Sequence, residues 1–525
     1  MTEVQQQPES TGAAPVHAPA KGKSRLEEFE HDDGRPAFIL TYTEVKLLGI
    51  AGVGFFLDAY DLFIINPVST MLQYRLYDGK PLPNGLSGFI KAAANIGSVI
   101  GQFGFGFAAD ALGRKAVYGK ELMLIIFATI MCISDPTNDL SPDGALIWLG
   151  VFRIILGVGV GGDYPMSASI TSDRSNLKKR GTMLAYIFSN QGWGSLIGAL
   201  VTIIVLSIYK HTMDVEGHTS KIDGVWRIVI GLSLIPAFGT LYQRLTLPES
   251  TRFIASQKSD EEMEADIKKI SDPATKEIGS DSSVDAEVPV EELVKQKAHF
   301  GEFIRYFSEW RHAKLLLGTC SCWFFLDIAF YGINLNQNVV LQEIGFAGKT
   351  GTPWEKLFKI STGNIIITAL GFVPGYYATI LTVEKLGRKW IQVQGFLLAA
   401  LFLAILAGKF DSLSHVGFII CFALLQFFFN FGANATTYMY PAELFPTRFK
   451  AFAHGISAAC GKAGAIISAL AFNSLATKIG TPNVLWIFFG CCIAGAVCTF
   501  LLPEVRGRDP DLVLAEEIRE GKARL

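Results

Sequence analysis

The chain has 525 residues, of which 50% are hydrophobic and only 18% are charged, and its formal net charge is −2. This composition excludes an ordinary soluble multidomain protein, and the balanced charge excludes a nucleic-acid partner bound through basic patches. About twelve apolar runs are each long enough, at roughly 20 residues, to cross a lipid bilayer as a helix. We therefore expect an all-α integral membrane protein, with spans that start near Lys46, Ser87, Ala116, Ala145, Thr182, Gly224, Lys314, Glu355, Lys389, Val416, Ala451 and Asn483.

The segment before the first span, residues 1–43, is rich in Pro, Ala, Gln and charge, which predicts a disordered cytosolic tail. It has no apolar signal-peptide core, so we expect the first span to act as the insertion signal. The eight cysteines of the whole chain lie in or beside apolar segments and lack zinc-type spacing. No metal site and no cofactor are expected.

Two carboxylates, Asp58 and Asp61, lie three residues apart in the first span and therefore on one helix face. Ionisable groups at bilayer depth are costly and usually line a substrate or ion pathway. Because two such close carboxylates do not both ionise cheaply, we expect at least one proton to be held there, which favours a proton-coupling role over a structural brace. Arg153, in the fourth span, is expected to pair with Asp61, either permanently or until Asp61 takes a proton.

The fourth span ends in the segment 161–173, GGDYPMSASITSD, which places Asp163 and Tyr164 in surroundings otherwise fit for lipid. A carboxylate and a phenol at this depth indicate a carrier. The preceding glycines at 157–162 satisfy the nucleotide-binding pattern G-x-G-x-x-G, but that pattern needs a strand before it and a helix after it. We expect them to allow close helix packing instead. Gln191, in the fifth span, adds an amide donor.

A polar stretch divides the spans six plus six. The division predicts a six-helix bundle at 44–249, a cytosolic loop at 250–311, a second bundle at 312–504 and a cytosolic tail at 505–525. Lys and Arg gather in the even-numbered loops, whereas the loop after the third span has none, so both termini and the central loop are expected to be cytoplasmic.

The two halves repeat their loop motifs. Asp110-Ala-Leu-Gly-Arg-Lys115 follows span two and Glu384-Lys-Leu-Gly-Arg-Lys389 follows span eight, while Leu247-Pro-Glu-Ser-Thr-Arg252 is echoed by Leu502-Pro-Glu-Val-Arg506. Repeats at equivalent positions imply a duplication, which many carriers use to rock one bundle against the other around a central site.

In the second half, Trp323, Asp327 and Tyr331 recur every four residues and so form one stripe on a helix face. With a carboxylate between the two aromatic side chains, this stripe indicates a polar cavity. Asn434 lies in span ten, and Lys462 is the one Lys or Arg near the middle of a second-half span. Lys462 either neutralises Asp327 as a buried pair or supplies the positive charge that an anionic substrate needs, and a ligand that displaces the pair would let both roles alternate.

The paired loop motifs, the Pro-Glu-Ser-Thr-Arg segment and the twelve spans resemble the major facilitator superfamily over nearly the whole chain. The segment 161–173 is similar to the span-four signature of the phosphate:proton symporter family, in particular of fungal high-affinity phosphate transporters. The resemblance implies two pseudo-symmetric six-helix bundles in the plasma membrane. It also implies substrate contacts by Tyr164, Gln191, Trp323, Asp327, Tyr331 and Asn434, proton handling by Asp58, Asp61 and Asp163, and gate clasps at Asp110, Gly113, Arg114, Glu384, Gly387 and Arg388.

The expected function is therefore import of dihydrogen phosphate across the lipid bilayer, coupled to protons by alternating access. Asp327 is expected to accept a hydrogen bond from a phosphate hydroxyl, which sulfate lacks at neutral pH. The alternatives are a sugar or organic-ion porter of the same superfamily, or a receptor that binds phosphate without net transport. An enzyme is not expected, because the chain has no G-x-S-x-G, no H-E-x-x-H and no clustered metal ligands.

Overall fold

The computed structural model describes residues 35–247, 300–348 and 350–522. The predicted N-terminal tail up to residue 34, the central loop from 250 to 299 and most of the Pro-Glu-Ser-Thr-Arg segment lie outside the described residues. The first half is built from α2 (Tyr42–Phe63), α3 (Ile65–Leu76), α4 (Asn84–Leu112), α5 (Arg114–Val117), α6 (Lys120–Ile133), α7 (Pro142–Arg174), α8 (Arg180–Ile208), α9 (Ile222–Gly231) and α10 (Leu234–Leu245), with short turns at His211–Val215 and Thr219–Lys221.

The second half begins with α13 (Phe300–Ser308) and ends with α23 (Pro510–Arg519). Between them lie α14 (Trp310–Asn334), α15 (Gln337–Glu343), α16 (Pro353–Ile367), a π-helical turn (Thr368–Phe372), α17 (Val373–Leu386), α18 (Arg388–Gly408), α19 (His415–Asn430), α20 (Ala433–Leu444), α21 (Lys450–Ile479), α22 (Thr481–Cys498) and a short turn (Thr499–Leu501). The described part of the chain contains no strand.

The predicted spans agree with these helices. Each predicted start lies within four residues of an observed one, as with Lys46 against the first residue of α2, Tyr42. Eleven helices or helix pairs of the described residues are long and apolar enough to cross a membrane. The twelfth span is α4, which falls below that level of hydropathy because it is rich in glycine and carries buried polar side chains such as Lys91, Asn95 and Gln102.

Local sequence signals explain where several helices start. Thr41 and Thr352 each accept a hydrogen bond from the backbone N–H of a glutamate three residues on, and each glutamate bonds back, which forms a capping box at the start of α2 and of α16. Gly113 and Gly387, the glycines of the repeated loop motif, have φ of 95° and 80°. This left-handed backbone suits glycine and turns the chain sharply from α4 into α5 and from α17 into α18.

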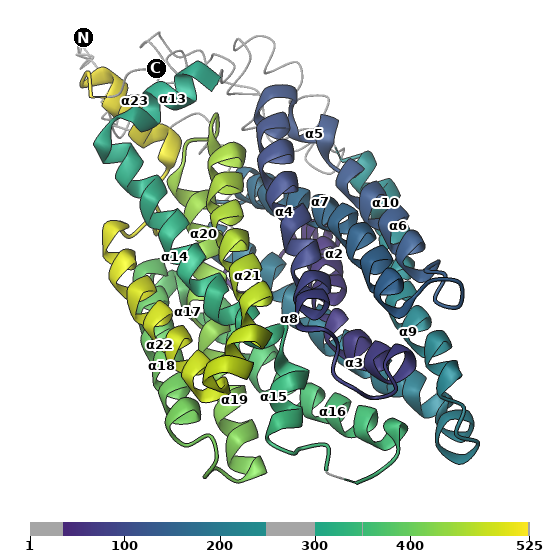
Figure 1. The fold of residues 1–525 in the computed structure, drawn as a ribbon. Helices are drawn as coiled ribbons and strands as arrows, with labels where there is room; N and C mark the ends of the chain where they lie inside the picture. Colours follow the sequence, from purple (N-terminus) through teal and green to yellow (C-terminus); the bar gives the residue numbers. More distant parts are fainter. Residues whose placement is uncertain (1–34, 248–299, 349, 523–525) are drawn as a thin grey trace, which may run out of the picture.

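The two halves lie side by side, with the first half at the right of Figure 1 and the second at the left. They meet mainly where α4 packs on α21 and where α8 packs on α16 and α17. Helices α13 and α23 lie at one end of the bundle, together with both ends of the described chain. We call this end the terminal end. The predicted central loop and C-terminal tail thus include two helices that sequence analysis did not anticipate, and these pack together through Phe303, Tyr306, Leu514 and Ala515.

Glycines let α4 and α7 approach each other closely. A Cβ atom added to Gly97 would lie 1.8 Å from the carbonyl oxygen of Ile154, and one on Gly157 would lie 2.0 Å from that of Ala94. The glycine run before Asp163 is therefore a helix-packing surface, as predicted, and it lies inside a continuous helix without the strand that a nucleotide site requires.

We expect Gly97→Ala to destabilise the protein, because its methyl group collides with the backbone of α7. Overpacking of this kind costs about 1–3 kcal/mol. Gly104→Ala on the same helix is the matched control, since nothing lies within 4 Å of its added Cβ. Thermal unfolding of the purified variants in detergent should give a lower melting temperature for Gly97→Ala and an equal or higher one for Gly104→Ala. Equal melting temperatures for both would contradict the packing account.

Candidate functional site

The centre of the site is a buried ion pair between Lys462 and the stripe predicted in the seventh span. Lys462 of α21 places its Nζ 3.4 Å from Oδ2 of Asp327 on α14, and both side chains are 1% exposed. The same ammonium donates to the phenol oxygen of Tyr331 at 2.6 Å. Trp323 and Asp327 both face α21, because a Cβ on Gly461 would meet both side chains. The predicted Lys462–Asp327 pair and the common face of the stripe are confirmed.

A chain of hydrogen bonds joins this centre to both halves. Gln191 of α8 donates to the phenol oxygen of Tyr164 at 2.6 Å, and Tyr376 of α17 donates to Oε1 of Gln191 at 3.2 Å. Asn434 of α20 donates to the phenol oxygen of Tyr376 at 2.8 Å. The Lys462 Nζ lies 5.0 Å from the ring centroid of Tyr164, and this contact connects the hydrogen-bond chain to the ion pair. All seven residues proposed from sequence for substrate contact therefore gather at one place, and their substrate roles stay predictions.

Tyr376 was missed by sequence analysis, although it links the two halves. It lies four residues after the π-helical turn Thr368–Phe372, in the stretch Gly-Phe-Val-Pro-Gly-Tyr-Tyr. Single π-helical turns often mark functional sites, and a Pro-Gly pair within an apolar span is the sequence signal that could have drawn attention to this position.

Asp58 and Asp61 lie on α2 and are fully buried, and none of their four carboxylate oxygens has a hydrogen-bond partner. The predicted ion pair between Arg153 and the Asp61 carboxylate is wrong. Arg153 donates instead to the backbone carbonyls of Asp61 at 3.0 Å, of Leu62 at 3.5 Å and of Ile90 at 3.3 Å. The carbonyls of Asp61 and Leu62 are available because α2 ends at Phe63 and the last turn of a helix leaves backbone acceptors without helical partners.

Asp163 forms a second buried charge cluster with two residues that sequence analysis missed. Arg244 of α10 donates to both oxygens of Asp163, at 3.1 and 3.0 Å, and to Oε1 of Glu121 on α6 at 3.1 Å. The Ser167 hydroxyl donates to Asp163 at 2.6 Å. Gly54 of α2 makes room for this cluster, since a Cβ there would lie 1.8 Å from the Arg244 guanidinium. Charge within an apolar span, the signal used for Asp58, also marks Glu121 and Arg244.

At the terminal end, the loop motif of the first half binds the second half directly. The Asp110 carboxylate accepts from the backbone N–H of Phe452 at 2.8 Å and forms an ion pair with Arg114 at 3.1 Å. Arg114 in turn donates to the carbonyl of Thr447 at 2.9 Å. Asp173, the last residue of the fourth-span segment, pairs with Lys450 of α21 at 2.8 Å. These bonds cross the interface between the halves.

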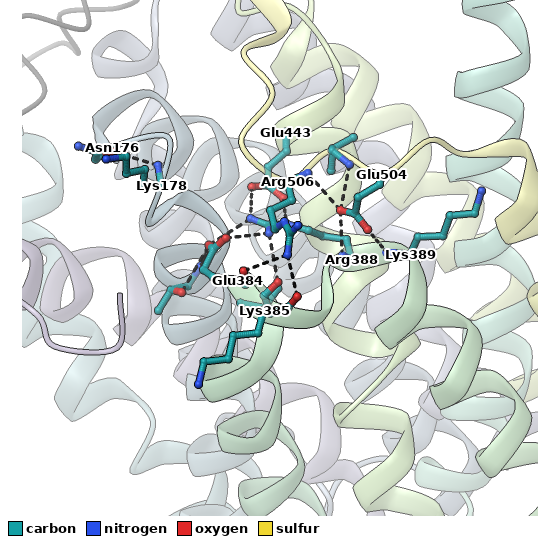
Figure 2. Close-up of polar contacts among 12 residues, drawn as sticks. Asn176, Lys178, Glu384, Lys385, Arg388, Lys389, Glu443, Glu504 and Arg506 are labelled. Atoms are coloured by element: carbon teal, nitrogen blue, oxygen red, sulfur yellow. Dashed lines mark hydrogen bonds and ion pairs between the residues drawn. The ribbon is translucent and has the colours of Figure 1, made fainter. Parts of the chain in front are cut away.

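The loop motif of the second half is held by an arginine among carboxylates, shown in Figure 2. Arg388 pairs with Glu384 at 2.9 Å and with Glu443 at 2.7 Å. Glu384 also accepts from the backbone N–H of Thr182, in the first half, at 3.0 Å. Glu504 of the Leu-Pro-Glu-Val-Arg segment accepts from the backbone N–H groups of Arg388 and Lys389, each at 3.0 Å. Both copies of the motif thus reach across to the other half.

The opposite end of the bundle is also closed. Asn66 of α3 donates to the carbonyl of Asn334 at 2.6 Å, and Lys91 of α4 donates to Oδ1 of Asn336 at 2.8 Å. A cavity at this end is lined by residues of both halves, among them Asn66 and Asn334. The ring of Phe63 separates the cavity from the site: it stacks on Tyr331 at 5.8 Å and meets Phe372 at 6.1 Å. Contacts between the two halves therefore exist at both ends of the bundle.

No group of three His, Cys, Asp or Glu residues that could hold a metal ion occurs among the residues the structure describes. The chemistry available at the centre is that of one ammonium, several phenol and amide donors, and one carboxylate acceptor. Charge and hydrogen bonds from such a set are chemically suited to an oxyanion.

Residues 47–513 match the family described as sugar (and other) transporter. A Schizosaccharomyces pombe protein provisionally named an inorganic phosphate transporter is 46% identical over 92% of this chain and 90% of its own length. An inorganic phosphate transporter of Saccharomyces cerevisiae is 37% identical over 91% of this chain and 84% of its own. Among solved structures, a proton:xylose symporter of the major facilitator superfamily aligns with a TM-score of 0.69 at 19% identity, over 90% of this chain and 98% of that chain. The last similarity establishes the fold.

We expect Arg244→Gln to destabilise the protein severely, because it leaves Asp163 and Glu121 buried without their counter-charge. Breaking a buried pair from one side costs about 3–5 kcal/mol. The double change Arg244→Gln with Asp163→Asn should recover part of this loss, since it removes one of the stranded carboxylates. Melting temperatures in detergent at neutral pH check the prediction. A single variant as stable as the double one would contradict it.

Proposed function

Because this chain belongs to the sugar (and other) transporter family of the major facilitator superfamily, we propose that it imports inorganic phosphate together with protons by alternating access. It is a membrane transporter and not an enzyme. The phosphate assignment follows the curated relatives, which are named as phosphate transporters. Their alignments cover about nine-tenths of this chain. The observation that carries the proposal is the Lys462–Asp327–Tyr331 cluster, which is buried and faces Tyr164 of the first half.

The donor set suits an oxyanion that leaves water. Such an ion loses strong hydration, and a buried site must replace it with hydrogen bonds and preferably one positive charge. Lys462 supplies the charge, while Tyr164, Tyr331 and Asn434 place phenol and amide groups around the same point. A sugar needs no buried ammonium, so the ion pair favours an anionic substrate over the sugar-porter alternative.

Asp327 accounts for the choice of phosphate among oxyanions. Dihydrogen phosphate keeps hydroxyl groups that can donate to a carboxylate, whereas sulfate is fully deprotonated at neutral pH and is repelled. Substrate that bridges Lys462 and Asp327 would replace their direct contact, which at 3.4 Å is already long for a charge-assisted hydrogen bond.

Protons are needed for energetic reasons. Moving one negative charge into an inside-negative compartment costs about 2.3 kcal/mol per 100 mV. At least two protons must accompany each monovalent phosphate before the membrane potential favours import. Asp58 and Asp61 support a proton-carrying role, because their carboxylates are buried and have no counter-ion in contact. Asp163 would join them when its bond to Arg244 is exchanged for a proton.

We place the protein in the plasma membrane with the terminal end in the cytoplasm. The support is the distribution of Lys and Arg among the loops, which follows the positive-inside rule. With that orientation, phosphate enters through the cavity beyond Phe63 and leaves between the two loop motifs.

We expect Asp327→Asn to lower phosphate uptake about tenfold or more and to weaken discrimination against sulfate. The amide no longer selects a substrate hydroxyl, and a charge-assisted hydrogen bond is worth about 1.5–3 kcal/mol. The measurement is radiolabelled phosphate uptake into proteoliposomes under an inward proton gradient, with sulfate as competitor. Unchanged selectivity would refute the role of Asp327. Wild-type protein that inserts properly and shows no uptake under any gradient would refute the phosphate assignment, and saturable binding without uptake would identify a receptor.

We expect Tyr376→Phe to raise the phosphate concentration for half-maximal uptake several-fold. The change removes the hydroxyl through which Gln191 and Asn434 of opposite halves are joined. Tyr377→Phe is the matched control, because the neighbouring ring is 39% exposed and its hydroxyl only accepts from Trp193 at 3.3 Å. Initial uptake rates over a phosphate series separate the two. Equal half-maximal concentrations for both variants would show that Tyr376 only fills space.

A further inference from the structure

The packing of α4 on α21 fixes which residues face each other at the level of Lys462. The two helices run antiparallel: Gly88 of α4 lies against the backbone of Ala469, and Gly455 of α21 lies against the carbonyl of Gln102. Asn95 lies seven residues from both Gly88 and Gln102, and Lys462 lies seven residues from both Ala469 and Gly455. Seven residues make about two helical turns and return to the same face. Asn95 and Lys462 therefore occupy opposite positions at the centre of this interface.

The Asn95 carboxamide is buried and has no partner. Its residue is 0% exposed, and neither Nδ2 nor Oδ1 has a hydrogen-bond partner. A buried amide group left in this state costs about 1–3 kcal/mol, and such groups are rare in native proteins unless a ligand or water completes them. A packing role does not explain a buried carboxamide without hydrogen bonds. A bound ligand would supply the missing hydrogen bonds.

The positive charge of the neighbouring Lys462 indicates that this ligand is an anion. An ammonium group has three hydrogens, and the contacts of Lys462 with Asp327 and Tyr331 use two of them. A tetrahedral oxyanion at this point would accept the third ammonium hydrogen through one oxygen and the Asn95 amide hydrogens through another. The structure assigns Asn95 as a further phosphate-binding residue, contributed by α4 from the first half. This inference rests on the proposed function and extends it.

The position of Asn95 gives the contact a consequence for transport. Its helix binds the second half near both ends, through Lys91 on Asn336 and through Asp110 on the N–H of Phe452. A phosphate held between Asn95 and Lys462 would tie α4 to α21 between these two contacts. Substrate then stabilises the closed arrangement of α4 and α21, and its departure removes that bond from an interface that must open.

The test compares Asn95→Leu with wild type and with Thr129→Val. Leucine has the same branched shape and the same number of side-chain heavy atoms as asparagine, and it removes both polar amide atoms. Thr129→Val is the matched control, because the Thr129 hydroxyl on α6 is equally buried and unpartnered but lies outside the α4–α21 interface. The apparent Kd for inorganic phosphate is measured by the shift of melting temperature with phosphate concentration, and uptake is measured in proteoliposomes. We expect Asn95→Leu to raise the Kd and the half-maximal uptake concentration about tenfold, without loss of stability when phosphate is absent. Thr129→Val should stay within twofold of wild type.

Asn95→Asp provides a second variant of nearly unchanged size. It places a carboxylate beside the anion and should weaken phosphate binding more than leucine does. If wild type binds phosphate and both Asn95 variants bind it within twofold of wild type, Asn95 is not a ligand, while the proposed function stands. If wild type itself neither binds nor takes up phosphate, the proposed function fails and this inference fails with it.

Discussion

The cost of placing charge inside a membrane protein governs how this structure is arranged. Three buried cations that bond carboxylates each join two helices: Lys462 joins α21 to α14, Arg244 joins α10 to α7, and Arg388 joins α18 to α20. An unpaired ion at such depth is expensive, so the partner cannot be withdrawn without a substitute. Each pair therefore fixes a helix contact and, at the same time, defines what a ligand or proton must supply to release it.

The unpartnered polar groups are as informative as the pairs. The Asp58 and Asp61 carboxylates and the Asn95 carboxamide are buried without hydrogen bonds in a structure where most buried polar atoms have them. All three lie in the first half, on α2 and α4, whereas the positive charge of the central site lies in the second half. The groups proposed to carry protons and the cation proposed to bind substrate are thus on different bundles, which suits a carrier whose halves move relative to each other.

Sequence alone predicted the membrane-spanning helices and most members of the central cluster, because hydropathy and the cost of buried charge act on single residues. It did not predict partners. The prediction of an Arg153–Asp61 ion pair was wrong because Arg153 bonds backbone carbonyls at the end of α2 instead. Hydropathy does not reveal where a helix leaves such carbonyls free. Arg244 and Glu121 were overlooked as partners of Asp163 because their helices, α10 and α6, become neighbours only through the tertiary fold. Tyr376 was overlooked because an aromatic residue in an apolar span is ordinarily a packing residue.

The absence of an ion pair between Arg153 and the Asp61 carboxylate has a functional advantage. A guanidinium bound to the Asp61 carboxylate would hold that group ionised and compete with any proton. Bound to the carbonyls of Asp61 and Leu62, Arg153 satisfies its own hydrogen bonds and anchors the end of α2 while the carboxylate stays free. The same residue pair thus separates two tasks. The backbone contact holds α2 against α7, and under the proposed proton coupling the side chain of Asp61 would take and release a proton without breaking that contact.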